Sequence, residues 1–150
     1  MTTLNTSLVD PELLRTFAFW GSILCLKVVA VVALTGRLRF KKQIFINTDD
    51  VEYFKKGKVV YTDPDIERVR RAHLNDLENI PLWFFVTFLW LTTGPAVWLA
   101  AILIRTFVLA RIIHTLSYAV YPKQPYRAIS FFIGLVIIIY QAISTLLYYL

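Results

Sequence analysis

The sequence predicts an all-α integral membrane protein built as a bundle of four transmembrane helices. Of its 150 residues, 57% are hydrophobic and only 17% are charged, and the mean hydropathy is +0.59. These values are untypical of a water-soluble domain. Four apolar stretches, 13–35, 72–91, 96–121 and 126–150, are long enough to cross a bilayer if a few polar groups are tolerated inside them. We therefore expect a single membrane domain over 1–150, with helices at about 11–39, 64–92, 95–121 and 125–149.

The first expected helix opens with a strong start signal. Asp10 can cap it, and Pro11 and Glu12 suit its first turn. Lys27 lies deep in this helix and should face another helix, with Asp76 or Glu78 as its partner; a lysine that snorkels to the interface is the alternative. The lone Cys25 has no intrachain partner, so no disulfide framework is expected, and Asn5 begins a glycosylation sequon that we expect to be unused.

Basic residues are concentrated in the first connection, at about 40–63, and around it. Ten of the 16 Lys and Arg residues lie between Arg37 and Arg71, and Lys123 and Arg127 flank the third connection. By the positive-inside rule these connections are cytoplasmic, which places both termini on the lumenal side. No interleaved aromatic and basic pattern accompanies the charge, so nucleic acid is not an expected partner.

The second expected helix carries polar residues into the bilayer. The run ERVRRAHLNDLE at 67–78 leads directly into the apolar segment 80–91, which is too short to cross alone. Glu67, Arg71, Asn75 and Glu78 form one helical stripe that must face the bundle interior or a hydrated cavity. Arg71 can pair along it with Glu67 or Asn75, and Pro81 is expected to bend the helix beyond it.

The third and fourth expected helices add polar groups at the same membrane depth. Arg111, His114 and Tyr118 share one face of the third helix, whereas the deeper Arg105 has no assignable partner. Arg127 lies in the first turn of the fourth helix, where it adds to the positive end of the helix dipole and favours an anion.

Together these side chains predict a basic cavity at the cytoplasmic mouth of the bundle. Arginine binds carboxylates bidentately and glutamate can pair with an ammonium group, which suits glutathione with its two carboxylates, amine and thiol. A cationic site also favours the thiolate form of the thiol. The side chains expected at this mouth are Arg39, Arg70, Arg71, His73, Asn75, Glu78, His114 and Arg127.

Three motifs carry a resemblance to a known family. The run ERVRRAHLNDLENI at 67–80, the run ARIIHT at 110–115, and QPYR at 124–127 followed by two phenylalanines resemble the membrane-associated proteins in eicosanoid and glutathione metabolism, the MAPEG family. Lys27 and Arg39 stand at matching spacing. Within the family the sequence is most similar to the microsomal glutathione transferase 1 group.

The resemblance implies a homotrimer of four-helix subunits that binds glutathione between adjacent subunits near the cytoplasmic face. It implies conjugation of glutathione to lipophilic electrophiles that enter from the bilayer, reduction of lipid hydroperoxides, and no metal. The expected location is the endoplasmic reticulum membrane, with the mitochondrial outer membrane as a second one. Arg127 would stabilise the thiolate, and Lys27, Asp76, Arg111 and His114 would support the site. The implied glutathione contacts are Arg39, Arg70, Arg71, His73, Asn75, Glu78 and Tyr118.

Departures from related subfamilies separate the alternatives. The related prostaglandin E synthase has an arginine, a serine and a tyrosine where this sequence has Leu74, Ala128 and Phe131, which disfavours that isomerase activity. The first connection lacks the sensor cysteine of the vertebrate transferases, so activation through that segment is not expected. A prostaglandin E synthase-like isomerase and a non-enzymatic membrane scaffold stay open as alternatives.

Overall fold

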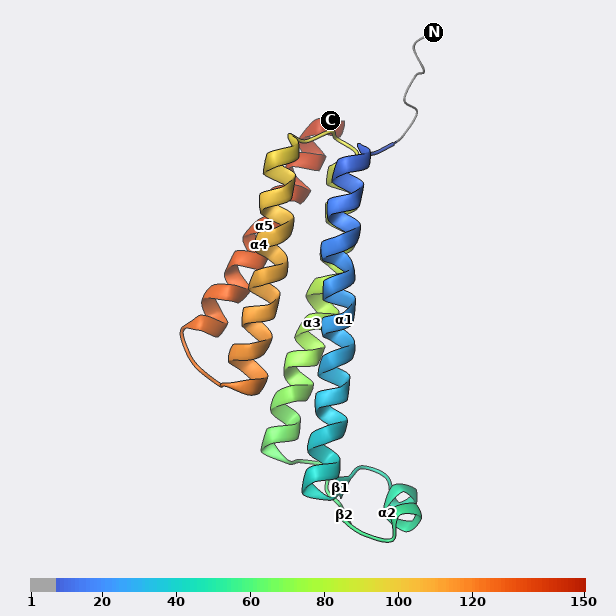
Figure 1. Cartoon of the computed structure of the whole chain (residues 1–150). Helices are drawn as coiled ribbons and strands as arrows, with labels where there is room; N and C mark the ends of the chain where they lie inside the picture. Colours follow the sequence, from blue (N-terminus) through green and yellow to red (C-terminus); the bar gives the residue numbers. More distant parts are fainter. Residues whose placement is uncertain (1–7) are drawn as a thin grey trace.

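Four long helices and a small two-stranded sheet make up the chain, for which a computed structural model describes residues 8–150. The sequon at 5–7 lies outside the described residues. The main elements appear in chain order in Figure 1. They are α1 (Pro11–Lys42), β1 (Ile44–Phe45), α2 (Thr48–Phe54), β2 (Lys58–Val59), α3 (Pro64–Leu91), α4 (Val97–Thr115), the π-helical turn η1 (Leu116–Val120) and α5 (Tyr126–Tyr149).

Length and composition confirm the prediction of a helical membrane protein. The helices Pro11–Lys42, Val97–Val120 and Tyr126–Tyr149 are each long and apolar enough to cross a bilayer. The outer surface carries large apolar side chains, including Leu26, Phe85 and Trp98, each at least 67% exposed. Such a surface is stable in contact with lipid rather than water. The helix α3 does not meet the same test, because polar residues fill its first half.

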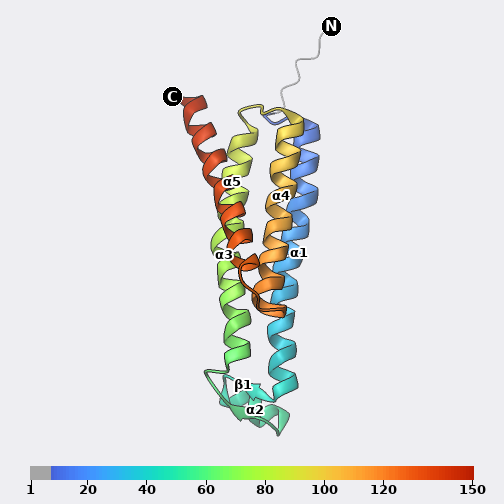
Figure 2. The same cartoon turned by 90° about the vertical axis from the view of Figure 1, so that its left-hand side faces the viewer.

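The helices of the bundle run up and down, so that both described chain ends lie at one end and the small sheet at the other (Figure 2). The α1 helix packs against α3 and α4, and α5 packs against α3 and α4. The core contains an aromatic stack in which the rings of Trp83 and Phe107 are parallel, with centroids 4.7 Å apart. Phe17 joins it from α1, with a centroid 5.5 Å from that of Trp83. This packing ties three helices together around one apolar centre.

Aspartate caps begin the two helices that carry the polar motifs. The carboxylate of Asp10 accepts from the backbone N–H groups of Glu12 and Leu13 at the start of α1. The carboxylate of Asp63 accepts from Asp65 and Ile66 at the start of α3. Each cap satisfies two of the free N–H groups at a helix start. The α3 helix continues through Pro81 as one helix to Leu91.

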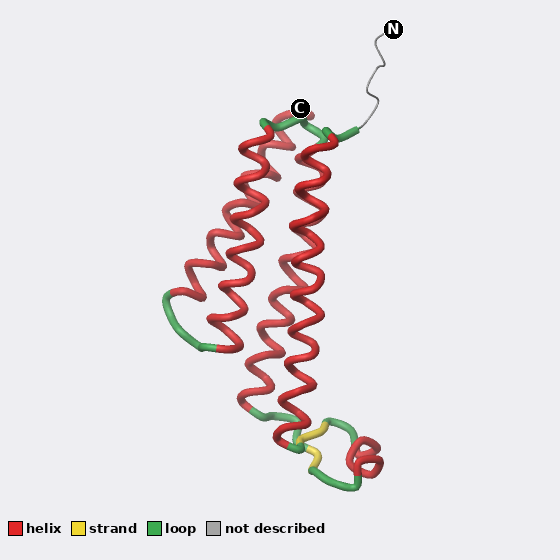
Figure 3. Tube along the Cα trace, in the orientation of Figure 1, coloured by secondary structure: helices red, strands yellow, loops and turns green. Residues whose placement is uncertain are grey.

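The connection between α1 and α3 is shorter than the expected 40–63 and contains regular secondary structure. The α1 helix continues to Lys42. The strands β1 and β2, which precede and follow α2 in the chain, then pair in parallel (Figure 3). The ring of Phe45 stacks on that of Phe54, with centroids 5.4 Å apart. Gly57 has a φ of 92°, and a Cβ there would lie 2.7 Å from the carbonyl oxygen of Gln43, so only glycine fits. The long projecting ends of α1 and α3 thus stop at a compact cap (Figure 1).

Candidate functional site

The polar half of α3 presents two different faces. Its buried residues recur every three or four positions, from Ile66 and Val69 through Ala72 and Asp76 to Ile80. Asp76 therefore stands on the stripe that packs into the bundle, and its side chain is fully buried. The rest of the polar motif, Arg70, Arg71 and Glu78 among them, lies on the exposed face. A helical period thus sends one acid inward and leaves the arginines accessible.

Asp76 forms the centre of a buried ionic cluster that joins three helices. Its carboxylate lies 2.5 Å from Nζ of Lys27 on α1 and accepts from Nη2 of Arg111 on α4 at 2.7 Å. Thr115, one turn after Arg111, donates its hydroxyl to the same carboxylate at 3.3 Å. Nη2 of Arg111 also donates to Oδ1 of Asn75 at 2.7 Å. The cluster contains two cations and one anion, so Asp76 is the counter-ion on which both basic groups depend.

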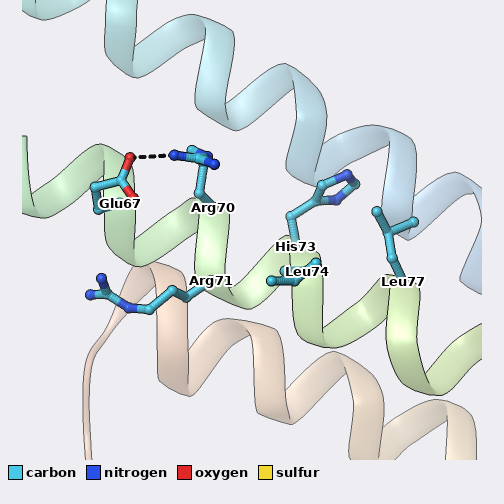
Figure 4. Close-up of a pocket in the computed structure, with 6 residues that line it drawn as sticks. All are labelled: Glu67, Arg70, Arg71, His73, Leu74 and Leu77. Carbon is cyan, nitrogen blue, oxygen red and sulfur yellow. Dashed lines mark hydrogen bonds and ion pairs between the residues drawn. The ribbon is translucent and has the colours of Figure 1, made fainter. Parts of the chain in front are cut away.

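A basic surface cavity lies beside this cluster on α3. Its volume is about 330 Å³. Figure 4 shows Arg70 and His73 on one side of the helix and Arg71 directed away from them. Nη1 of Arg70 donates to Oε1 of Glu67 at 2.8 Å, and Nδ1 of His73 is buried without a hydrogen-bond partner among residues 8–150. The lining residues are Glu67, Arg70, Arg71, His73, Leu74 and Leu77.

The charges of this cavity suit an anionic ligand that also carries a cation. The lining contains two guanidinium groups and one carboxylate, so it has an excess of positive charge. Arg71 is exposed and forms no ion pair within residues 8–150, which leaves its five N–H donors available. Glu67 forms its ion pair with Arg70 and not with Arg71, although the spacing of Glu67 and Arg71 had allowed them to pair. The cavity therefore offers one free and one prealigned carboxylate-binding group.

A second group of candidate residues lies where η1 meets α5. The guanidinium carbon of Arg127 lies 4.6 Å from the centre of the Tyr118 ring. With its amide oriented to accept, Oε1 of Gln124 lies 2.6 Å from Nη2 and 3.2 Å from Nε of Arg127. The ring of His114 packs edge-on against Tyr118, with centroids 5.6 Å apart. Stacking fixes the plane of the guanidinium and leaves N–H donors on its free edge.

The chain distributes the residues expected to bind glutathione over several places. Arg70, Arg71 and His73 share the α3 cavity, whereas Asn75 is turned towards Arg111. Tyr118 is paired with Arg127 on η1 and α5. Neither Arg39, half-buried near the end of α1, nor the exposed Glu78 lines the α3 cavity. A single chain thus presents two partial sites rather than one closed pocket.

Two contacts of the buried cluster and of these partial sites were not anticipated from the sequence. Thr115 donates a hydrogen bond to Asp76 in the buried cluster, and Gln124 accepts hydrogen bonds from Arg127. Both residues carried a usable signal: Thr115 follows Arg111 by one helical turn, and Gln124 precedes Arg127 by three residues. Leu74 and Leu77 follow Arg70 by four and seven residues, so helical spacing places them beside it in the lining of the α3 cavity.

Comparisons with known proteins agree with the motifs. The model of the MAPEG family matches residues 17–147. Microsomal glutathione S-transferase 1 of Homo sapiens is 40% identical over 133 residues, which cover 86% of each chain. Its counterpart in Rattus norvegicus is 40% identical over 131 residues, or 85% of this chain and 84% of that protein. Prostaglandin E synthase of Bos taurus is 31% identical over 124 residues, or 83% of this chain and 81% of that protein.

The family match extends from α1 to α5 and includes the buried cluster, the α3 cavity and the Arg127–Tyr118 stack. The resemblance read from the polar motif is therefore confirmed over most of the sequence. The chain belongs to the MAPEG family.

Proposed function

We propose that the protein is a membrane-bound glutathione transferase that joins the glutathione thiolate to lipophilic electrophiles. The observation that carries the proposal is the basic α3 cavity with Arg70, Arg71 and His73, in a chain 40% identical to microsomal glutathione S-transferase 1. Identity to prostaglandin E synthase is lower, at 31%, which favours the transferase over the isomerase. The same thiolate also reduces lipid hydroperoxides in this proposal.

The α3 helix and the end of α1 bind the peptide part of glutathione. Arg70 and Arg71 each pair with a carboxylate, and bidentate pairing gives orientation as well as affinity. Glu78 pairs with the ligand's ammonium group, while His73 and Asn75 hydrogen-bond to its amides. Arg39 and Tyr118 complete the contacts from neighbouring elements.

Arg127 holds the sulfur as a thiolate. Its guanidinium is stacked on Tyr118 and oriented by Gln124, so it presents N–H donors without reorganisation during the reaction. The thiol proton passes to solvent, and the thiolate sulfur then forms a bond to the electrophilic carbon while the leaving group departs with its electron pair. With a hydroperoxide, the sulfur is oxidised and the O–O bond is cleaved; a second glutathione yields the disulfide, the alcohol and water.

The buried cluster keeps α3 in register beside the ligand. Arg111 binds both Asp76 and Asn75, so it fixes the rotation of the helix that carries the arginines. Lys27 adds a bond from α1, and His114 packs against the ring of Tyr118. These four residues, Lys27, Asp76, Arg111 and His114, act as positioning residues.

The assembly in this proposal is a homotrimer whose subunits each cross the membrane four times. The two partial sites of one chain are separate, and a site between subunits would bring the α3 cavity of one copy to Arg127 of another. The basic connections face the cytoplasm and the termini face the lumen of the endoplasmic reticulum. The mitochondrial outer membrane is a second proposed location.

Glutathione binding tests the function directly. Titration calorimetry of the protein in detergent should show saturable binding, and binding should produce the thiolate absorption band in the ultraviolet. Conjugation of a lipophilic aryl halide should follow. Absence of glutathione binding would leave the scaffold alternative, and conversion of a prostaglandin endoperoxide without conjugation would instead support the isomerase.

A further inference from the structure

The protein carries two arginines in a surface cavity at the end of the bundle opposite the proposed glutathione site. This cavity, of about 450 Å³, lies between α1 and α4. Both helices begin at the bundle end where the described chain termini lie (Figure 2). Its lining residues are Glu12, Arg15, Thr16, Phe19, Trp20 and Arg105.

Arg105 is the more unusual of the two arginines. It is exposed on an apolar helix, and it forms no ion pair or side-chain hydrogen bond within residues 8–150. It follows Val97, the first residue of α4, by eight positions, which places its Cα about 12 Å along the helix axis. A guanidinium at that depth is costly unless an anion meets it or it reaches the interface.

The two arginines can reach the same level of the membrane. Side chains of a helix lean towards its N-terminus, and for both α1 and α4 this is the nearby end of the bundle. Arg15 lies only about 6 Å along α1 from Pro11. The side chain of Arg105 must therefore extend farther than that of Arg15 to reach the same level. Two guanidinium groups at one level provide bidentate donors for a phosphate.

The remaining lining residues lie on both sides of the arginine level, one nearer the start of α1 and the others deeper along it. Glu12 lies one turn nearer the helix start than Arg15, so its carboxylate is the outermost charged group of the cavity. Phe19 lies one turn deeper, and its ring packs edge-on against that of Trp20, with centroids 5.6 Å apart. From the membrane surface inward, the cavity therefore offers an anion, two cations and an aromatic wall.

We propose that this cavity binds a phospholipid whose headgroup carries both a phosphate and a primary ammonium group. The phosphate lies between Arg15 and Arg105, the ammonium pairs with Glu12, and the glycerol and acyl chains lie along Phe19 and Trp20. The order of charges across such a headgroup, with the amine outside the phosphate, matches the order of the lining residues. An acidic lipid without an amine would leave the Glu12 carboxylate beside its phosphate. The proposal does not depend on the catalytic function.

Native mass spectrometry of the intact detergent-purified protein provides the test. We expect dioleoylphosphatidylethanolamine to give more bound lipid than dioleoylphosphatidylglycerol, and dioleoylglycerol, which lacks phosphate, to give the least. The double variant Arg15→Leu/Arg105→Leu should bind phosphatidylethanolamine at least about tenfold more weakly, since each charge-assisted contact contributes about tenfold or more. Arg37→Leu, at the other end of α1, is the matched control and should bind as the unmodified protein does.

The variant Glu12→Gln separates the two parts of the headgroup. It should remove the preference for phosphatidylethanolamine over phosphatidylglycerol while phosphate-dependent binding persists. Unchanged lipid binding in the double arginine variant, or equal binding of dioleoylglycerol, would overturn the proposal. A loss of subunits from the assembly in Glu12→Gln, with lipid binding unchanged, would also overturn it, because Glu12 would then pair with a second copy rather than with a lipid. Circular dichroism of each variant establishes that the helices are retained.

Discussion

Arg111 donates to the carboxylate of Asp76 at 2.7 Å in the interior of the bundle, and both side chains are at most 1% exposed. Lys27 occupies the other oxygen of the same carboxylate. One anion thus pairs with cationic groups from two other helices, and the position of α3 depends on it.

Replacing Asp76 by Asn should destabilise the bundle severely. The change leaves Lys27 and Arg111 close together without a counter-ion, and breaking a buried pair in this way costs about 3–5 kcal/mol. Thermal unfolding in detergent should show a much lower Tm. Asp49→Asn, an exposed acid on α2, is the control and should leave the Tm nearly unchanged.

Replacing Lys27 by Met should cost much less than Asp76→Asn. Asp76 keeps Arg111 as its counter-ion, and the cluster loses only its excess cation. Under the same unfolding conditions the Tm should fall by less than half as much as in Asp76→Asn. Equal losses in the two variants would contradict the central role of Asp76.

Replacing Arg127 by Ala should abolish formation of the glutathione thiolate. In the proposed site the stacked guanidinium supplies the positive charge near the sulfur, and removal of one preorganised donor of this type lowers turnover by about 100-fold or more. The measurement is the thiolate absorption band on addition of glutathione, together with conjugation rates. Tyr118→Phe keeps the aromatic face and should retain most of the band, whereas an unchanged band in Arg127→Ala would rule out this role.

Replacing Arg71 by Ala should weaken glutathione binding without affecting the fold. Its guanidinium is unpaired within residues 8–150, so the variant loses a ligand contact and leaves no buried protein group unsatisfied. Loss of a charge-assisted contact should raise the Kd by about 10- to 100-fold in titration calorimetry. Arg37→Ala, which lies outside the cavity, should bind glutathione normally.

The connection between α1 and α3, residues 43–63, should become less stable at low pH. The Lys42 ammonium donates to the carboxylate of Asp63 at 2.8 Å and 2.9 Å and holds the pKa of that group below its usual range. The stabilisation is complete above the usual pKa of about 3.9, and it is lost as the pH falls through the lower folded value. Amide hydrogen exchange of residues 43–62 should therefore accelerate over that range.

The variant Lys42→Met checks the origin of this pH dependence. It should speed exchange of residues 43–62 already at neutral pH and shift the titration of Asp63 towards its usual value. Lys41→Met, at the exposed neighbouring position, should leave both properties unchanged. Lys42 also pairs with Asp65 at 2.6 Å, so identical exchange in the two variants would show that neither ion pair of Lys42 holds the connection.

Much of the fold was readable from local signals. The caps at Asp10 and Asp63 follow from the residues around them, because a short acidic side chain before proline satisfies the free N–H groups of a helix start. The connection at 43–63 was less predictable. Its order depends on contacts between Phe45 and Phe54 and on the strand pairing of distant segments, none of which has a local signature.

The candidate site shows the same division. The polar run on α3 predicted that its side chains have partners or a function, since charged groups on an apolar helix need one or the other. The sequence did not decide which residues form ion pairs with one another. Asp76 rather than Glu78 faces Lys27, and Arg70 rather than Arg71 pairs with Glu67.

By itself the sequence determined that the chain is a helical membrane protein of the MAPEG family. Hydropathy and the contiguous polar motif depend only on the order of residues along the chain. Only the tertiary structure decided that Asp76 is shared by Lys27 and Arg111 and that Arg127 lies over Tyr118. Those contacts depend on how each helix is rotated about its axis and how closely its neighbours pack. Helical spacing shows only which residues share one face of a helix. The packing of the whole bundle decides which residue of a neighbouring helix each of them contacts.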